Sequence, residues 1–198
     1  MGWTGICILS KKPAEKESLD TDTAYGLLIE AKPGRVRELA RKSRKDYEII
    51  AVAGGDLEVN RAAVECPEVD LLLYPWGKGE VRRDPGVNYI IAKLAAKNNV
   101  AIEFSLSQLV ESSGKTRGIV FAHMVNTARI VRKAKAPFAL TSGAQSPWEA
   151  RAPEELKALG RALGFTEPQI KKALDGGIVK ENRKRLSGKW AMPGVEKE

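Results

Sequence analysis

Short runs of hydrophobic residues alternate along this chain with segments whose apolar positions recur every three or four residues. The runs contain few polar residues, which is typical of strands buried on both faces of a parallel sheet. The segments between them are typical of amphipathic helices. This alternation predicts a parallel β/α repeat with the helices outside the sheet. The expected strands are 5–9, 24–29, 49–53, 69–73, 100–104 and 138–141.

The helix with the clearest pattern is expected over 86–98. The lead-in Asp84-Pro85-Gly86 suits a helix start, because proline fixes φ and needs no partner for its nitrogen. The pair Asn98-Asn99 suits the end, because asparagine tolerates the left-handed conformation. Lys93 and Lys97, four residues apart, share the other side of this helix. The buried side is expected to contain Val87, Ile90, Ile91, Leu94 and Ala95.

The remaining helices are indicated by their caps and by their apolar spacing. A strongly basic helix is expected from Pro33 to about Asp46, and its cations fit a solvated surface and a phosphate-binding surface equally well. Asp56 is placed to cap the next helix, another helix begins near residue 152, and Thr166 begins a capping box. A long helix over 117–134 is expected to bury Phe121, Met124, Val125, Ala128 and Val131.

Two residues have both a structural and a functional interpretation. Trp76 could stack on a nucleic-acid base, but a tryptophan beside a proline at a strand end more often packs, and we favour packing. His123 lies on a different side of its helix from the buried residues. It is the only histidine, which excludes a histidine-rich metal site, and a surface or partner-facing imidazole is favoured over a catalytic base.

Chain length and composition indicate the number of domains and the net charge. A chain of 198 residues suits one domain, expected over 1–179 and followed by a basic, flexible tail over 180–198. The 33 Lys and Arg residues against 25 Asp and Glu give a net charge of +8. Such a charge favours association with a polyanion, most often a nucleic acid. No apolar run approaches the ~20 residues that cross a bilayer.

The motifs of several enzyme classes are missing from the sequence. Cys7 and Cys66 are isolated from each other and from His123, which favours two buried free thiols in a reducing cytoplasm over a metal or redox pair. No glycine-rich phosphate loop follows the first expected strand, and no serine or cysteine has a histidine at motif spacing. The sequence therefore argues against nucleotide-binding enzymes and triad hydrolases.

Two stretches resemble a known family. DPGVNYIIAKLAAKNNVAIEFSL at 84–106 and LTSGAQSPWEARAPEEL at 140–156 are similar to ribonuclease P protein component 3, the archaeal counterpart of the eukaryotic thirty-kilodalton subunit. The resemblance runs through nearly the whole chain, and Asn60-Arg61 and the YPW at 74–76 also fit it. It implies a TIM-barrel-like parallel β/α fold, related to the polymerase and histidinol phosphatase hydrolases.

The chain departs from that pattern in two ways. In the hydrolase relatives the last strand typically ends in an Asp-x-His metal pair, whereas the matching places here look like Gly143 and Gln145, which cannot replace those ligands. The family also usually begins one strand and helix earlier. We therefore expect a barrel that lacks this first unit and is open at that seam, with a mis-assigned start of the chain as the alternative.

The resemblance implies a protein subunit of the ribonucleoprotein endonuclease that removes 5′ leaders from precursor tRNA in archaea. The polypeptide alone is expected to be non-catalytic and to bind no metal, with Mg²⁺ on the RNA subunit, which performs the hydrolysis. The expected partners are the ribonuclease P RNA, precursor tRNA indirectly, and other protein subunits, especially a small ferredoxin-like one, in the cytoplasm. The candidate RNA-binding residues are Arg82, Arg83, Lys93, Lys97, Arg61, Arg117 and Arg151.

Two alternatives remain open from the sequence. The first is a stand-alone metal-dependent phosphoesterase, in which Asp56, Glu103 and Glu30 near strand ends bind Mg²⁺. The capping position of Asp56 and the buried strand around Glu103 count against it. The second alternative is a basic RNA-binding protein of another particle. Composition alone does not distinguish such a protein from a ribonuclease P subunit.

Overall fold

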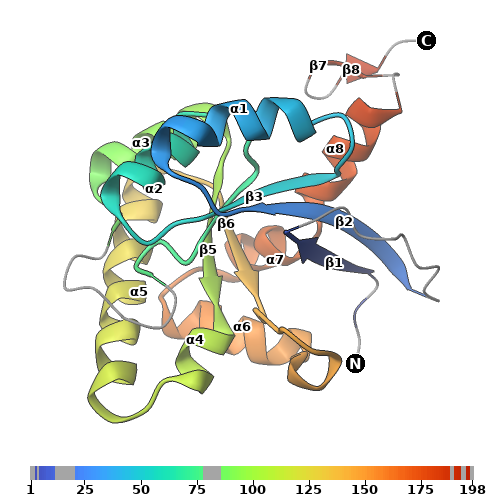
Figure 1. The fold of residues 1–198 in the computed structure, drawn as a ribbon. Helices are drawn as coiled ribbons and strands as arrows, with labels where there is room; N and C mark the ends of the chain where they lie inside the picture. Colours follow the sequence, from blue (N-terminus) through green and yellow to red (C-terminus); the bar gives the residue numbers. More distant parts are fainter. Residues whose placement is uncertain are drawn as a thin grey trace.

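Six parallel strands form one sheet that curls into an open half-barrel, with helices on its outer side (Figure 1). The computed structural model describes residues 3, 5–11, 21–77, 86–187, 190–192 and 195–196. Each strand pairs in parallel with the next along the chain, from β1 to β6. The predicted fold class and the open seam are confirmed. The strands are β1 Gly5–Ser10, β2 Asp22–Ile29, β3 Ile49–Ala53, β4 Leu71–Leu73, β5 Ala101–Ser105 and β6 Phe138–Thr141.

Helices follow most of the strands, as the sequence predicts, and a group of helices follows β6. In the described residues, none of them is long and apolar enough to span a membrane. A short hairpin of β7 Trp190–Met192 and β8 Val195–Glu196 comes last. The helices are α1 Pro33–Ser43, α2 Leu57–Val64, α3 Tyr89–Asn98, α4 Leu106–Glu111, α5 Gly114–Ala134, the 3₁₀ turn η1 Pro147–Glu149, α6 Pro153–Ala162, α7 Glu167–Leu174 and α8 Gly177–Leu186.

Capping side chains fix where these helices begin. Asp56 caps α2 as predicted, because its Oδ1 accepts a hydrogen bond of 2.8 Å from the backbone N–H of Val59. The predicted start of α3 at residue 86 was wrong by three residues. Asn88 is its N-cap, since the Asn88 Oδ1 accepts from the N–H of Ile91 at 2.9 Å. The helix ends at Asn98, and Asn99 takes the left-handed conformation with φ 57°.

The main core lies between the sheet and the outer helices, where aromatic rings gather. Trp76 has no exposed surface, and its ring centroid is 6.1 Å from that of Phe104. Phe138 of β6 stacks on Phe165, with 3.9 Å between ring centroids. The interpretation of Trp76 as a packing residue is therefore confirmed, because a fully enclosed indole cannot reach a nucleic-acid base.

Three sets of residues expected to be buried are exposed. Ile90 of α3 is 64 % exposed and Phe121 of α5 is 39 % exposed, because the packed stripe of each helix is narrower than its apolar stripe. In β1, Ile6, Cys7 and Ile8 are exposed, although the run 5–9 predicts a strand buried on both faces. In the described residues β1 is an edge strand paired only with β2, and an edge strand of an open sheet lacks cover on one side.

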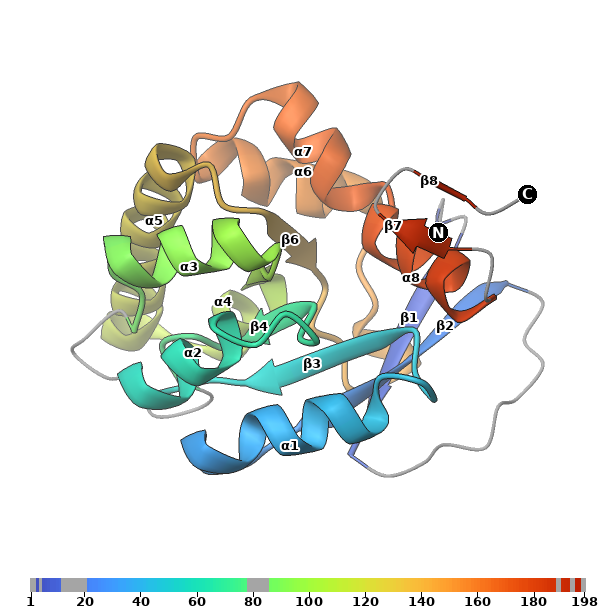
Figure 2. The same ribbon diagram turned by 90° about the horizontal axis from the view of Figure 1, so that it is seen from above.

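The predicted domain boundary at residue 179 falls inside α8. This helix lies against the β2–β3 side of the sheet (Figure 2), where the Nδ2 of Asn182 donates to Oδ1 of Asp70 at 2.9 Å and Arg183 pairs with Glu48 and with Asp22. The prediction of a flexible tail was therefore wrong for residues 180–187. The basic composition of this segment suggested solvent, but two of its polar side chains find partners more than a hundred residues earlier in the chain.

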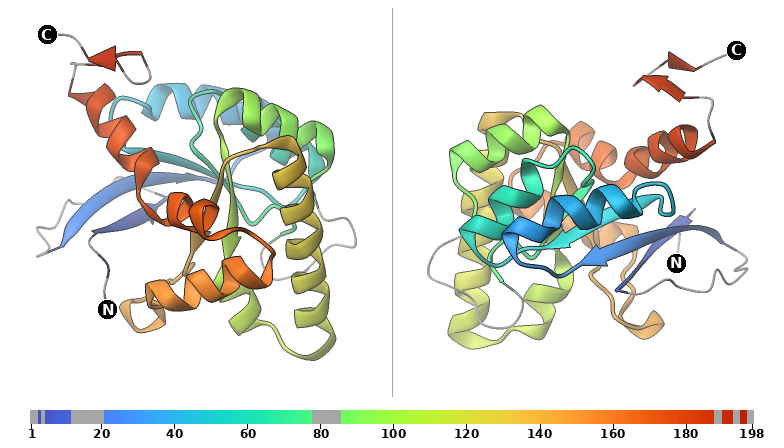
Figure 3. Two further views of the ribbon diagram at one scale, coloured as in Figure 1. Left: turned by 180° about the vertical axis from the view of Figure 1, so that it is seen from behind. Right: turned by 45° about the horizontal axis from the view of Figure 1, so that its top comes forward.

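Seen from behind, α7 and α8 run along the side of the half-barrel where β1 and β6 are not paired with each other (Figure 3). Ile178 and Val179, at the start of α8, pack against the smaller apolar cluster on the inner face of the sheet, which includes Ile49 and Leu71. The helix therefore supplies apolar cover that a closed barrel would obtain from further strands.

Candidate nucleic-acid-binding face

Helices α3 and α5 pack against each other on one side of the half-barrel (Figure 1) and contain cations but no acidic residue. Tyr89, Lys93 and Lys97 follow one another every four residues on α3, and Arg129 and Lys133 are also four apart on α5. All five are exposed. We call the surface made by these five residues, together with the exposed Ile90, the α3–α5 face.

An aromatic ring links the two helices at this face. The Nζ of Lys93 lies 5.5 Å from the ring centroid of Tyr89, and the Nζ of Lys133 from α5 lies 5.4 Å from the same centroid. Both distances are within the range of cation–π attraction. The ring is 43 % exposed. Two ammonium groups beside an accessible ring combine the two contacts that single-stranded RNA offers, a phosphate charge and a base to stack on.

Within the residues that the structure describes, no carboxylate neutralises the cations of the α3–α5 face. None of its lysines or arginines forms an ion pair with a carboxylate in the part of the chain that the structure describes. The neighbouring helix α2 differs, because the Nε of Arg61 lies 2.8 Å from Oε1 of Glu65. A cation without an internal partner keeps its full charge for an external phosphate.

The structure separates the predicted RNA-binding residues. Lys93 and Lys97 share the α3–α5 face, whereas Arg117 lies at the far end of α5 and donates from Nε to the carbonyl of Ser112 at 2.8 Å. Arg61 is paired on α2, and Arg151 precedes α6, on another part of the molecule. Arg82 and Arg83 lie outside the described residues.

Sequence reasoning missed Arg129 and Lys133. The available signal was that α5 contains five cations and no acid, with these two on the side opposite its buried residues. Arg132 is adjacent to Lys133 in the sequence but does not belong to the α3–α5 face. Its Nη1 donates to the carbonyl of Gly164 and its guanidinium carbon lies 5.9 Å from the centroid of the Phe165 ring, so it packs toward α6 and α7.

The carboxyl end of β6 has no room for the metal ligand that the hydrolase pattern places there. Gly143 has φ +66°, and a Cβ at this position would meet the Ser105 Oγ at 2.0 Å and the Ser107 Oγ at 2.4 Å. The backbone therefore approaches these two serines at a distance that only glycine allows. Gln145 is exposed, and its N–H donates to Oε2 of Glu149 at 2.8 Å within its own loop.

The three carboxylates of the phosphoesterase alternative have separate structural roles. Asp56 caps α2, and Glu30 pairs with the Nζ of Lys11 at 2.7 Å. Glu103 is only 3 % exposed, and its Oε1 accepts from the Thr141 hydroxyl at 2.6 Å. Among the described residues, no group of three His, Cys, Asp or Glu side chains is arranged to hold a metal ion. These residues do not fit the metal site of the hydrolases.

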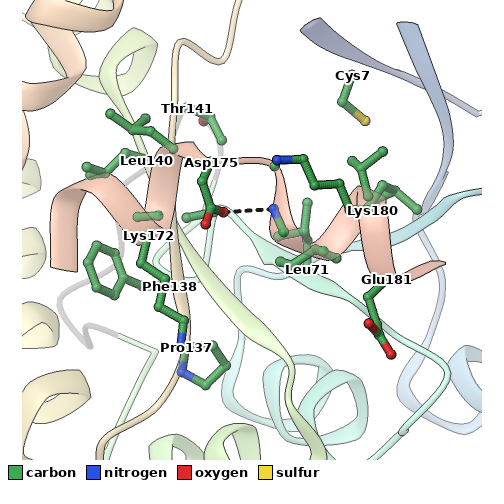
Figure 4. A pocket seen from close by; sticks show the side chains of 18 of the residues that line it. Cys7, Leu71, Pro137, Phe138, Leu140, Thr141, Lys172, Asp175, Lys180 and Glu181 are labelled. Carbon is green, nitrogen blue, oxygen red and sulfur yellow. Dashed lines mark hydrogen bonds between the residues drawn. The ribbon is translucent and has the colours of Figure 1, made fainter. Parts of the chain in front are cut away.

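A cavity of about 770 Å³ lies at the open seam, between β1, β6, α7 and α8 (Figure 4). Its wall includes Phe138, Leu71 and the thiol of Cys7. Burial raises the pKa of this thiol to about 12, with further increases from the carboxylates of Glu48 and Asp70. Although Cys7 is exposed at the cavity wall, its raised pKa keeps the thiol protonated at neutral pH and makes it a poor nucleophile.

The fold and the candidate site define a class of protein: an α/β half-barrel with a cationic helical face, in which the described residues form no cluster of three metal-ligating side chains. A family model described as RNase P subunit p30 matches residues 8–186. The chain therefore belongs to the ribonuclease P subunit p30 family, as the resemblance predicted.

Individual relatives agree with this assignment. Ribonuclease P protein component 3 of Haloarcula marismortui is 32 % identical over 93 % of this chain and 78 % of the relative. The same component of Thermococcus kodakarensis is 38 % identical over 75 % of this chain and 65 % of the relative. A chain in the cryo-EM structure of archaeal ribonuclease P with mature tRNA matches with a TM-score of 0.83. This match covers 98 % of our chain and 89 % of the other at 24 % identity, and it supports the fold.

Proposed function

We propose that this chain works as a protein subunit of ribonuclease P and holds the RNA of that ribonucleoprotein against the α3–α5 face. In this proposal the RNA subunit binds Mg²⁺ and hydrolyses the 5′ leader of precursor tRNA. The protein neutralises phosphates and fixes the RNA conformation, and it contributes no catalytic group. Membership of the p30 family supports the assembly, and the charge of the α3–α5 face supports the mode of binding.

The observation that carries the proposal is that α3 and α5 contain seven cations and no acid, with no ion pair to the protein within the described residues. Each phosphate that a lysine or arginine neutralises releases counterions, so the logarithm of affinity falls with the logarithm of salt concentration. Lys93, Lys97, Arg129 and Lys133 are the cations of this face. We therefore expect RNA affinity to depend steeply on salt.

Protein partners follow from the same assembly. The curated relatives are named as a numbered protein component, which fits a particle with several protein subunits. We include other ribonuclease P proteins among the partners, a small ferredoxin-like subunit among them, and precursor tRNA as an indirect partner. The two free cysteines fit a reducing cytoplasm as the compartment.

The test compares two double variants that remove the same charge from different faces. Lys93→Ala with Lys133→Ala changes the α3–α5 face, whereas Lys171→Ala with Lys172→Ala removes two exposed cations from α7. Affinity for the ribonuclease P RNA is measured between low and physiological salt. We expect the affinity of the first variant for the RNA to fall about tenfold at low salt. We also expect the slope of the logarithm of affinity against the logarithm of salt concentration to become shallower by roughly 1.5.

The α7 variant is the matched control and is expected to stay near the unmodified chain in both affinity and slope. Equal losses in the two variants would show that only net charge matters and would reject the α3–α5 face. An unchanged slope in the Lys93 and Lys133 variant would reject it as well. Thermal melting of each variant confirms that the fold is intact, since exposed helical alanines cost little stability.

A further inference from the structure

Trp148 has 93 % of its surface exposed, which is unusual for the largest apolar side chain. It lies in η1, the turn that joins β6 to α6. This turn is held by its own side chains. The carboxylate of Glu149 accepts from the Gln145 N–H at 2.8 Å and from the Ser146 hydroxyl at 3.1 Å. Pro147 restricts the backbone in the same turn.

A fixed turn that presents an indole to solvent is suited to an interface. The exposed ring has an unfavourable contact with water in the free chain, and covering it recovers that free energy. Because the turn is already ordered, a partner loses little conformational entropy when it covers the ring. Tryptophan is also among the residues that contribute most to binding when they are buried at the centre of an interface.

A hollow of about 390 Å³ lies beside this turn, between it and α4. Val110 of α4 lines the hollow and is 50 % exposed. Two carboxylates, of Glu111 and Glu149, line the same space. We call the surface made by Val110, Glu111, Gln145, Trp148, Glu149 and Arg151 the Trp148 patch.

The charge of the Trp148 patch is opposite to that of the rest of the chain. Hydrogen bonds from the Gln145 N–H and the Ser146 hydroxyl lower the pKa of Glu149, which keeps this carboxylate ionised at neutral pH. The single cation of the patch is Arg151, whose Nη1 lies 3.9 Å from Oε1 of Glu155. An acidic and apolar patch on a chain with a net charge of +8 repels phosphate and complements a basic protein surface.

We propose that the Trp148 patch docks a second protein subunit of ribonuclease P, with a basic contact surface and an apolar recess that takes the indole. The identity of the assembly rests on the proposed function, and the contact chemistry rests on the patch. The chain then uses two separate surfaces, the α3–α5 face for RNA and the Trp148 patch for protein. The opposite charges of the two surfaces select different partners.

The experiment uses the other ribonuclease P protein subunits from the same organism as probes, each purified and titrated without RNA against the full chain. We expect one of them to bind, with an affinity at least about 30-fold weaker for Trp148→Ala and intermediate for Trp148→Phe. Glu111→Lys is expected to weaken the same complex. Leu57→Ala is the matched control, because Leu57 is an exposed apolar residue of α2 that belongs to neither surface, and it should leave the complex unchanged.

Tryptophan emission gives a second readout. Subtracting the spectrum of Trp148→Phe from that of the unmodified chain isolates the signal of Trp148. An exposed indole emits at long wavelength, and the difference signal should shift to shorter wavelength when the protein subunit covers the ring. Trp76 is already enclosed in the core, so its emission should not move.

Three outcomes would overturn the proposal. In the first, every subunit binds Trp148→Ala and the unmodified chain equally. In the second, Trp148→Ala weakens RNA binding by the isolated chain, which would make the indole a platform for a base. In the third, the change affects only self-association of the chain in sedimentation. The proposed function fails separately, when the Lys93 and Lys133 variant keeps full RNA affinity while Trp148→Ala loses the protein subunit.

Discussion

Cations at two places in this molecule have different surroundings and therefore different roles. At the end of the half-barrel that α8 covers, Arg44 is 8 % exposed and pairs with Asp70, and Arg183 pairs with Glu48 and Asp22. At the α3–α5 face, the lysines and Arg129 are exposed and have no carboxylate partner among the described residues. The first group holds the chain together, and the second is available to an external anion.

The difference follows from the cost of desolvating a charge. A buried cation is tolerated only when a carboxylate and further hydrogen bonds compensate it, so removing one partner leaves an uncompensated charge. An exposed lysine stays hydrated and contributes little to stability. The same residue types therefore predict opposite phenotypes, a loss of stability at one place and a loss of RNA affinity at the other.

The largest effect is expected for Asp70→Ala. The Asp70 carboxylate accepts hydrogen bonds from Arg44, from the Ile50 N–H at 2.7 Å and from Asn182 at 2.9 Å. Its removal leaves a buried guanidinium without its anion, and we expect the free energy of unfolding to fall by about 3–5 kcal/mol. Urea denaturation measures this change.

Glu65→Ala is the control for that experiment, because it breaks the exposed pair with Arg61 and should change the free energy of unfolding far less than Asp70→Ala. Similar losses in the two variants would mean that burial does not separate the two kinds of ion pair.

Arg183→Ala should have a smaller effect of the same kind. Its side chain is 36 % exposed, and besides the two carboxylates it donates to the carbonyl of Thr23 at 3.0 Å. We expect a loss of about 1–2 kcal/mol in the free energy of unfolding and no change in affinity for the ribonuclease P RNA. A weaker RNA complex with unchanged stability would move Arg183 into the binding group.

Lys97→Ala is expected to show the opposite phenotype. It should lower the salt slope of RNA binding by about 0.7–0.9, the contribution of one phosphate, and change stability by less than about 0.5 kcal/mol. Filter binding at several salt concentrations and a melting curve test both parts. A lower melting temperature with an unchanged slope would place Lys97 among the structural cations.

The smallest effect concerns Cys7, whose thiol is influenced by the carboxylates of Glu48 and Asp70. Its folded pKa of about 12 lies above that of a free thiol, so its contribution to stability is complete below about pH 8.5 and is lost as the pH rises toward 12. At pH 8 the native thiol should react with a disulfide reagent more slowly than a free thiol, because a smaller fraction of it is thiolate. Fast labelling of Cys7 in the native chain, with Cys66→Ala to remove the second thiol, would contradict this.

The local spacing of apolar and capping residues was sufficient to predict much of the fold. The alternation of apolar runs and helical segments, the cap at Asp56 and the capping box at Thr166 are each visible within a few residues, and the structure contains all of them. The resemblance carried by residues 84–106 and 140–156 gave the family. These features depend on backbone propensities and on short-range hydrogen bonds, which the sequence contains directly.

Only the tertiary structure decided which residues are covered and which charges are paired. Arg183 and Glu48 are 135 positions apart, and no local pattern connects them. In the same way, the exposure of Ile90, the edge position of β1 and the contact of Lys133 with Tyr89 depend on which elements lie beside each other. The sequence determined a parallel α/β protein of the p30 family with many cations. The fold assigned those cations to structure or to binding, because desolvation and Coulomb energy depend on distances in space rather than along the chain.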